Sequence, residues 1–196
     1  MGKSATYAVA NLIEGKQDWY KGLFADYEKL VTRDPKAEEY TKTSDGQDLW
    51  TELLKLLNLE SSYKKLDAVK RIFLNAIATA GTAEEIPPII AIRYLRSCSE
   101  LEIEDLVALK ANYDIRHDPD LVPHGGYHDW ASRVASHLHY GSSDAMAISH
   151  ERLAKEGLVQ RRTAGDNSGM SLRENFGITA HGMGFCRFAF EDRYLG

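Results

Sequence analysis

The run Arg152-Leu153-Ala154-Lys155-Glu156-Gly157-Leu158-Val159-Gln160-Arg161-Arg162 contains the clearest change of secondary structure in the chain. The residues before Gly157 favour helices, and a glycine at this point permits the left-handed conformation in which many helices end. Leu158 and Val159 then begin a segment with the composition of a β-strand. The run therefore predicts a helix that stops at Gly157 and a strand that follows it directly.

Two helices are expected before this point, joined by a short turn. The first carries a large apolar residue at every fourth position over 130–138 and stops near Gly141. The second begins after one of three N-cap candidates, Ser142, Ser143 and Asp144. Downstream, residues 158–178 predict a β-hairpin with a polar tip, and Thr179 caps a last helix. The C-terminal order is helix, turn, helix, hairpin, helix.

This order, and the residues at its junctions, resemble winged-helix proteins. In that family the recognition helix ends at a Gly-Leu-Val or Gly-Leu-Ile step into the wing, to which Gly157-Leu158-Val159 is similar. The wing returns to a Leu-Thr-x-x-Gly start of the next helix, to which Ile178-Thr179-Ala180-His181-Gly182 is similar. The resemblance implies that residues 117–196 form a winged-helix (winged helix-turn-helix) module.

A looser resemblance lies in the middle of the chain. Residues 75–78, 89–95 and 99–106 look like bacterial abortive-infection alpha-type proteins and related uncharacterised families, in which a helical middle precedes a winged-helix end. This resemblance implies a regulatory or defence-associated role, such as antiviral defence.

A winged helix can bind DNA or dock on a protein, and the sequence leaves both functions open. The first hypothesis is a regulatory or defence-associated protein that binds DNA through its C-terminal winged helix. For DNA binding, the second helix would face the major groove and the wing would contact phosphates, through His150, Arg152, Lys155, Arg161 and Arg162. Against DNA binding, three carboxylates on the same helix would repel the DNA backbone: Asp144, Glu151 and Glu156. The alternative is a non-enzymatic protein–protein interaction module with the winged helix as its docking surface.

The N-terminal segment, residues 1–33, is expected to be one long amphipathic helix. Apolar residues recur there at mostly three- or four-residue spacing over 4–32. The stripe would pack on the rest of the fold, or would form a homodimer seam or a contact with a partner helix. Residues 34–48 are polar and contain Pro35 and Gly46, so a loop or hinge is expected there as a linker.

Residues 49–116 are expected to form a helical region. Dense apolar residues predict helices over 49–57 and 66–77, the second of which ends at Gly81. Two capping boxes predict further helices that start at about residues 83 and 100: Thr82 with Glu85, and Ser99 with Glu102. The predicted fold class is mainly α, with a small β-hairpin near the C-terminus.

Composition restricts the class of protein. The 196 residues carry 24 basic and 29 acidic side chains, and the net charge of −5 argues against a protein that coats nucleic acid by charge alone. The longest near-apolar stretch, 86–94, contains two prolines and an arginine, so no membrane-spanning helix is expected. The chain has two cysteines, Cys98 and Cys186, which excludes a disulfide scaffold and suits a reducing cytoplasm.

Histidines are the one compositional anomaly, since all seven lie between His117 and His181. The metal-site candidates are His124 and His128, with Asp129 adjacent, but the chain has no His-Glu-x-x-His pattern. The alternative is that the histidines line a helix surface or an interdomain contact. The chain also has no phosphate-binding loop and no dinucleotide fingerprint, which disfavours nucleotide-dependent enzymes. We expect no catalytic residue and no cofactor, and the third hypothesis is an enzyme that uses the histidine cluster.

Overall fold

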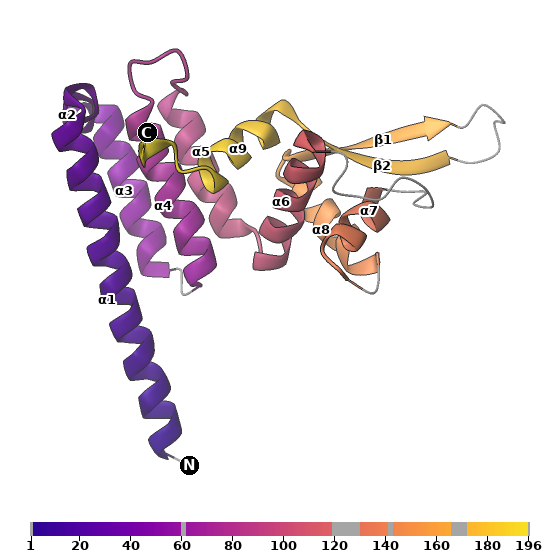
Figure 1. Cartoon of the computed structure of the whole chain (residues 1–196), viewed down its shortest axis with the longest axis horizontal. Coiled ribbons are helices and arrows are strands. Elements are labelled where there is room, and N and C mark those ends of the chain that lie inside the picture. The colour runs from indigo at the N-terminus through magenta and orange to yellow at the C-terminus, as the bar shows by residue number, and fades with distance from the viewer. Residues whose placement is uncertain (1, 60–61, 119–129, 141–142, 166–171, 196) are drawn as a thin grey trace.

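The computed structural model of the chain is mainly helical (Figure 1) and describes residues 2–59, 62–118, 130–140, 143–165 and 172–195. Its N-terminal part consists of α1 (Gly2–Arg33), α2 (Pro35–Lys42), α3 (Ser44–Leu59), α4 (Tyr63–Ala78) and α5 (Pro88–Glu100). Its C-terminal part consists of α6 (Ile103–His117), α7 (Trp130–His137), α8 (Asp144–Lys155), β1 (Val159–Gly165), β2 (Leu172–Ile178), α9 (Ala180–Phe190) and the 3₁₀ helix η2 (Arg193–Leu195).

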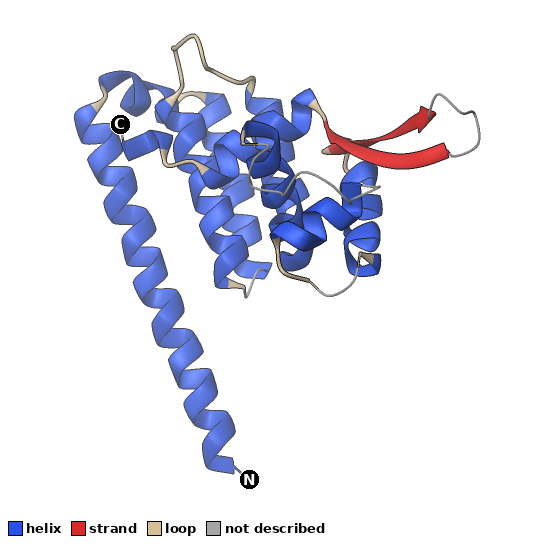
Figure 2. Ribbon diagram, turned by 45° about the vertical axis from the view of Figure 1, so that its right-hand side comes forward, coloured by secondary structure: helices blue, strands red, loops and turns tan. Residues whose placement is uncertain are grey.

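The helices form two neighbouring groups, as both ribbon views show (Figures 1 and 2). In the first group, α1, α2, α3 and α5 surround α4. In the second group, α6, α7 and α8 pack on one another, and the hairpin extends away from them. α9 follows the hairpin back toward the first group, where it packs on both α4 and α6. The chain therefore returns to its N-terminal helices before it ends.

α1 confirms the long helix predicted for the N-terminal segment. Leu23 and Leu30 on its stripe are buried, whereas Phe24 beside them is 48% exposed. Neither α1 nor any other helix within the described residues is both long and apolar enough to cross a membrane.

α4 is the centre of the hydrophobic core. The helix predicted over 66–77 is confirmed, and the apolar residues that predict it are each 5% exposed or less: Leu66, Val69, Ile72, Phe73, Ala76 and Ile77. Gly81, which was expected to end the helix, takes a φ of +68° just after α4 stops at Ala78.

The loop expected over residues 34–48 is wrong, because α2 and the start of α3 occupy this segment. Asp34 is the N-cap of α2 and accepts a hydrogen bond from the Lys36 N–H at 2.9 Å, while Pro35 takes a first-turn position. Proline is favoured at that position because its missing N–H would be unsatisfied there in any case. Gly46 lies so close to the backbone of Tyr40 that a Cβ would collide with it, so the glycine allows α2 and α3 to pack closely.

The helix starts expected at about residues 83 and 100 are also wrong. Residues 82–87 form turns and extended chain, and α5 begins only at Pro88. α6 begins at Ile103, where the Glu102 side chain accepts from the N3 backbone and Asp105 accepts from the Glu102 N–H at 2.9 Å. The reciprocal cap therefore uses Glu102 with Asp105 rather than Ser99 with Glu102.

The element order predicted for the C-terminal part is present: α7, α8, a hairpin and α9. β1 and β2 pair antiparallel, with Val159 opposite Ile178 at the base and Gly165 opposite Leu172 toward the tip. Within the described residues, this two-stranded sheet is the only β-sheet.

A single buried amide joins the end of the chain to the core. Asn75, on α4, is 0% exposed. Its Nδ2 donates to the carbonyl oxygens of Phe188 at 2.9 Å and Glu191 at 2.8 Å, and its Oδ1 accepts from the Tyr194 N–H at 2.9 Å. These partners are backbone groups in the last turn of α9 and just after it, where no helix bonds are available to satisfy them. Asn75 thus fixes α9 and η2 on α4.

Replacement of Asn75 by alanine tests this role. Asn75→Ala should lower the free energy of unfolding by about 2 kcal/mol or more, because it leaves several buried backbone groups without partners. Asn58→Ala, on an exposed position of α3, is the matched control and should stay within about 0.5 kcal/mol of the wild type. Urea denaturation measures both values, and equal stability of the two variants would contradict the role of Asn75.

Candidate interaction surface on α8 and the hairpin

α8 ends in the cap that its sequence predicts. Gly157 takes a φ of +73°, the left-handed conformation, and the Leu158 N–H donates back to the Leu153 carbonyl at 2.9 Å. Leu158 is fully buried, so the chain leaves the helix through the core before β1 begins. The expected helix stop at Gly157 is confirmed.

The start of α9 is built on the same junction. The Thr179 hydroxyl accepts from the Gly182 N–H at 2.9 Å and donates to the Gly157 carbonyl at 2.7 Å. A Cβ on Gly182 would collide with the carbonyl oxygen of Leu158, so only glycine permits this approach. The end of α8, the start of β1 and the start of α9 therefore hold one another in place.

The inner face of α8 includes His150, which is 0% exposed. Its ring stacks on Phe176 of β2 with centroids 4.6 Å apart and planes 9° apart. Its Nε2 lies 3.0 Å from the Nδ2 of Asn112 on α6. The expected groove-facing position of His150 is therefore corrected: the spacing of α8 turns this residue inward, and its ring packs between α6 and β2.

Arg152 forms a two-pronged ion pair with a buried carboxylate. Its Nε and Nη2 donate to the two oxygens of Asp105 at 2.7 and 2.8 Å, and Asp105 is 0% exposed. Hydrogen bonding to Asp105 raises the pKa of Arg152 above its ordinary value. Because Asp105 also caps α6, the pair ties the outer side of α8 to the first turn of α6.

The three remaining residues proposed to contact DNA differ in their surroundings. Arg161, on β1, forms an exposed ion pair with Glu151 of α8. Lys155 is exposed on the last turn of α8, and no ion pair is found for it among the described residues. Arg162 lies in β1, but its side chain is outside the described part of the structure. The structure thus brings Arg152, Lys155 and Arg161 to one side of α8, where carboxylates pair with both arginines.

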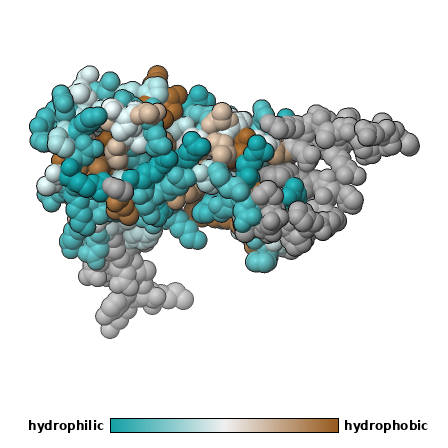
Figure 3. Space-filling model, turned by 45° about the horizontal axis from the view of Figure 1, so that its top comes forward, coloured by the Kyte–Doolittle hydropathy of each residue, from teal (hydrophilic) through white to brown (hydrophobic). Residues whose placement is uncertain are grey.

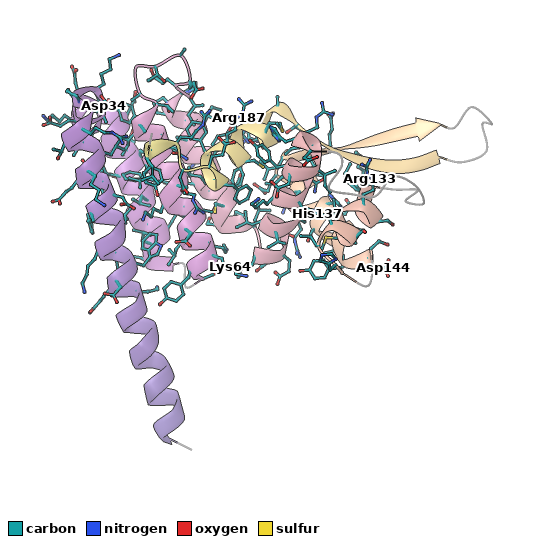
Figure 4. All side chains as sticks on the ribbon, in the orientation of Figure 1. Asp34, Lys64, Arg133, His137, Asp144 and Arg187 are labelled. Atoms are coloured by element: carbon teal, nitrogen blue, oxygen red, sulfur yellow. The ribbon has the colours of Figure 1, made fainter. Side chains whose placement is uncertain are left out.

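The outward face of α8 has an apolar centre. Ile148 is 58% exposed, and Asp144 and Glu151 lie one helical turn before it and close to one turn after it. Figure 4 labels Asp144 at the start of α8, with Arg133 and His137 on the neighbouring α7. On the face drawn in Figure 3, by contrast, most of the surface is hydrophilic and apolar residues form small separate groups.

The metal and thiol candidates do not join this surface. His124 and His128 lie outside the described residues. Within the described residues, no group of three or more histidine, cysteine, aspartate or glutamate side chains could hold a metal ion. Cys98 and Cys186 are free thiols buried in α5 and α9, and burial raises the pKa of Cys186 well above its ordinary value.

A polar cluster that the sequence did not predict lies where α5, α8 and α9 meet. The ring of His181 lies 5.0 Å from that of Tyr94, and its Nε2 is buried without a hydrogen-bond partner among the described residues. Ser97 donates to Glu156 at 3.0 Å on the same side of α5. Burial and the nearby Arg93 cation lower the pKa of His181 below 6.5, against the opposing effect of Glu156.

Sequence reasoning missed two residues that organise the surface, Asp105 and Asn112. Glu102 and Asp105 could have been recognised as a helix start, because acidic side chains are favoured in the first turn. Asn112 has no comparable signal, since its contact with His150 depends on how α6 and α8 pack.

Comparison with known proteins identifies no relative from which a function could be transferred to this chain. No protein-family model matches the chain, and no curated protein or solved structure matches it.

Alanine substitution tests whether Arg152 stabilises the fold, in contrast to the solvent-facing Lys155. Arg152→Ala should lower the free energy of unfolding by about 3 kcal/mol, because it leaves the buried Asp105 carboxylate without its counter-charge. Lys155→Ala, one turn along the same helix, should change stability by less than about 0.5 kcal/mol. Thermal unfolding of both variants provides the measurement, and a small effect of Arg152→Ala would refute a structural role.

The His181 environment predicts a pH dependence. A lowered pKa means that the unfolded chain binds the proton more readily, so stability is complete above about pH 6.5 and declines as the pH falls below it. The contribution of one such group is at most about 1.4 kcal/mol per pH unit. His181→Gln, which cannot take up the proton, should show a shallower decline between pH 7 and 5 in denaturant unfolding. Parallel curves for the two proteins would rule out this contribution.

Proposed function

We propose that this chain is a non-enzymatic interaction protein, in which a winged-helix-like module formed by α6 to α9 docks on another protein through the outward face of α8. The element order and the Gly157 and Thr179 junctions support the winged-helix-like assignment. In such a module α8 occupies the place of the recognition helix and β1–β2 the place of the wing.

The observation that carries the proposal is the internal pairing of the arginines. DNA binding gains most of its affinity when unpaired cations displace counter-ions from phosphates. Here Arg152 is held by Asp105 and Arg161 by Glu151, so each would have to give up a carboxylate before it could bind a phosphate. The surface also presents Asp144, a carboxylate that repels a polyanion.

The same face has the pattern of a protein contact. Ile148, at 58% exposed, lies at the centre and charged groups lie around it. Protein interfaces commonly bury an apolar centre within a polar rim, whereas an apolar side chain gains little from a phosphate backbone. We therefore propose protein docking ahead of DNA binding.

DNA binding is the competing proposal, and Lys155 favours it. This exposed cation has no ion pair among the described residues, and Arg162 follows Arg161 on the wing strand. Under this proposal the DNA contacts are made by Lys155, Arg161, Arg162 and the exposed part of Arg152.

Substitution at the centre of the face tests the docking proposal. Ile148→Asp should reduce capture of a partner from native lysate at least tenfold, because a charge would be desolvated at the interface. Ile89→Asp is the matched control, since Ile89 is 73% exposed on α5 and outside this face. A partner retained by the wild type and by Ile89→Asp, but lost with Ile148→Asp, supports the proposal; equal capture by both variants contradicts it.

A mobility shift on mixed-sequence DNA separates the two proposals. Protein docking predicts no shift at low salt. A shift that weakens steeply with salt, and weakens further in the double variant Arg161→Ala, Arg162→Ala, would replace docking by DNA binding.

A further inference from the structure

Two exposed cations lie at the C-terminal end of α8. Lys155 is exposed on its last turn, two residues before Gly157. Arg93 is exposed on α5, and its Nη2 lies 3.9 Å from the point that a Cβ on Gly157 would occupy. Because α5 belongs to the first helix group and leads directly into α6 (Figure 1), the end of α8 carries cations from both helix groups.

Neither cation is occupied by a carboxylate of the described residues. No ion pair is found there for Arg93 or Lys155, whereas the arginines of α8 and β1 each have one. The carboxylate next in sequence, that of Glu156, accepts a hydrogen bond from Ser97 at 3.0 Å. The chain has more acidic than basic side chains, 29 against 24, so its composition does not predict two such cations at one place.

The helix end attracts Arg93 but does not neutralise it. The last carbonyl groups of a helix together carry about half an elementary negative charge, which favours a cation beside them. A guanidinium carries a full positive charge and several N–H donors, and Arg93 is exposed to solvent. Burial and the Arg93 cation together lower the pKa of His181, so this charge also acts at the start of α9. Arg93 therefore keeps both charge and donors available to an external anion.

The two cations continue the exposed face of α8 that has Ile148 at its centre. Ile148 and Lys155 are seven residues apart, which is about two helical turns or about 10 Å along the axis. Both are exposed, and so is Glu151 between them, which pairs with Arg161. A helix that lies along this face would meet an apolar side chain first and unpaired cations two turns further on.

We propose that the partner of the α8 face is an acidic amphipathic helix, whose apolar side chain covers Ile148 and whose carboxylates bind Lys155 and Arg93. The inference rests on the docking function proposed above and names the chemistry of the partner. A carboxylate accepts two N–H bonds from one guanidinium, so Arg93 recognises it by geometry as well as by charge. The apolar and acidic residues of the partner should lie about two turns apart, as Ile148 and Lys155 do.

An acidic helix fits this surface better than a nucleic acid does. Two cations release only about two counter-ions from DNA, which gives weak binding. Ile148, which is 58% exposed, gains little from phosphates but is buried by an apolar side chain of a helix. Charge complementarity at the end of α8 and apolar burial at its centre therefore indicate the same class of partner.

Binding of defined peptides to the full chain tests the proposal. The probe is a labelled helical peptide of about 20 residues, with leucine at its centre and glutamates about two turns to either side, so that both directions of binding are covered. A comparison peptide has lysine in place of each glutamate. In fluorescence anisotropy at low salt, the wild type should bind the glutamate peptide about tenfold more tightly or better. Equal binding of the two peptides, binding of neither, or tighter binding of mixed-sequence duplex DNA would overturn the proposal.

Charge reversal on the protein tests the two cations. The double variant Arg93→Glu, Lys155→Glu should reverse the preference, so that it binds the lysine peptide more tightly. The neutral variant Arg93→Gln, Lys155→Gln adds no carboxylate beside the helix end, and it should lose the preference while thermal unfolding shows that it is folded. Lys29→Glu, Arg116→Glu is the matched control, because it makes the same change of net charge at exposed positions of α1 and of the last turn of α6. It should bind both peptides as the wild type does.

Ile148→Asp separates this inference from the docking function on which it rests. If this variant loses the glutamate peptide while both double variants at Arg93 and Lys155 keep it, docking through α8 stands and the acidic partner is overturned. If Ile148→Asp binds the peptide as the wild type does, docking through the centre of the face is itself contradicted. Loss of binding with Ile148→Asp, together with the reversed preference of Arg93→Glu, Lys155→Glu, supports both.

Discussion

The hydrogen bonds of Asn75 constrain how the two halves of the chain combine. This buried amide satisfies three backbone groups, one in the last turn of α9 and two beyond it, and so holds the end of the chain against α4, at the centre of the core. α9 in turn packs on α6 and is joined through Thr179 to the end of α8. The position of α8 and the hairpin is therefore set by contacts that extend back to the N-terminal helices.

The charges on α8 have two roles. Asp105 is buried at the first turn of α6, where it needs a counter-charge, and Arg152 supplies it from α8. Glu151 similarly occupies Arg161 at the surface. α8 therefore presents a nearly balanced face with Ile148 at its centre, which favours a protein partner over a phosphate backbone.

Local signals account for what the sequence predicted well. Gly157 and Thr179 act through their own backbone and neighbouring residues, and the stripes of α1 and α4 repeat with the helical period. The loop prediction for 34–48 is wrong because Pro35 and polar residues suit the first turn of a helix as well as a loop, and here the Asp34 cap starts α2. The burial of His150 and the partners of Arg152 could not be predicted in this way, because they depend on where α6 packs. Asn75 gave no signal, since one polar residue in an apolar helix does not identify its partners.

If α9 joins both helix groups to one core, the chain should unfold as one unit. Scanning calorimetry measures this directly, through the ratio of the calorimetric to the van't Hoff enthalpy. We predict a single transition with a ratio of about 1, the value for two-state unfolding. Two separate transitions, one for the N-terminal helices and one for α6 to α9, would show that the Asn75 contact does not couple the two groups.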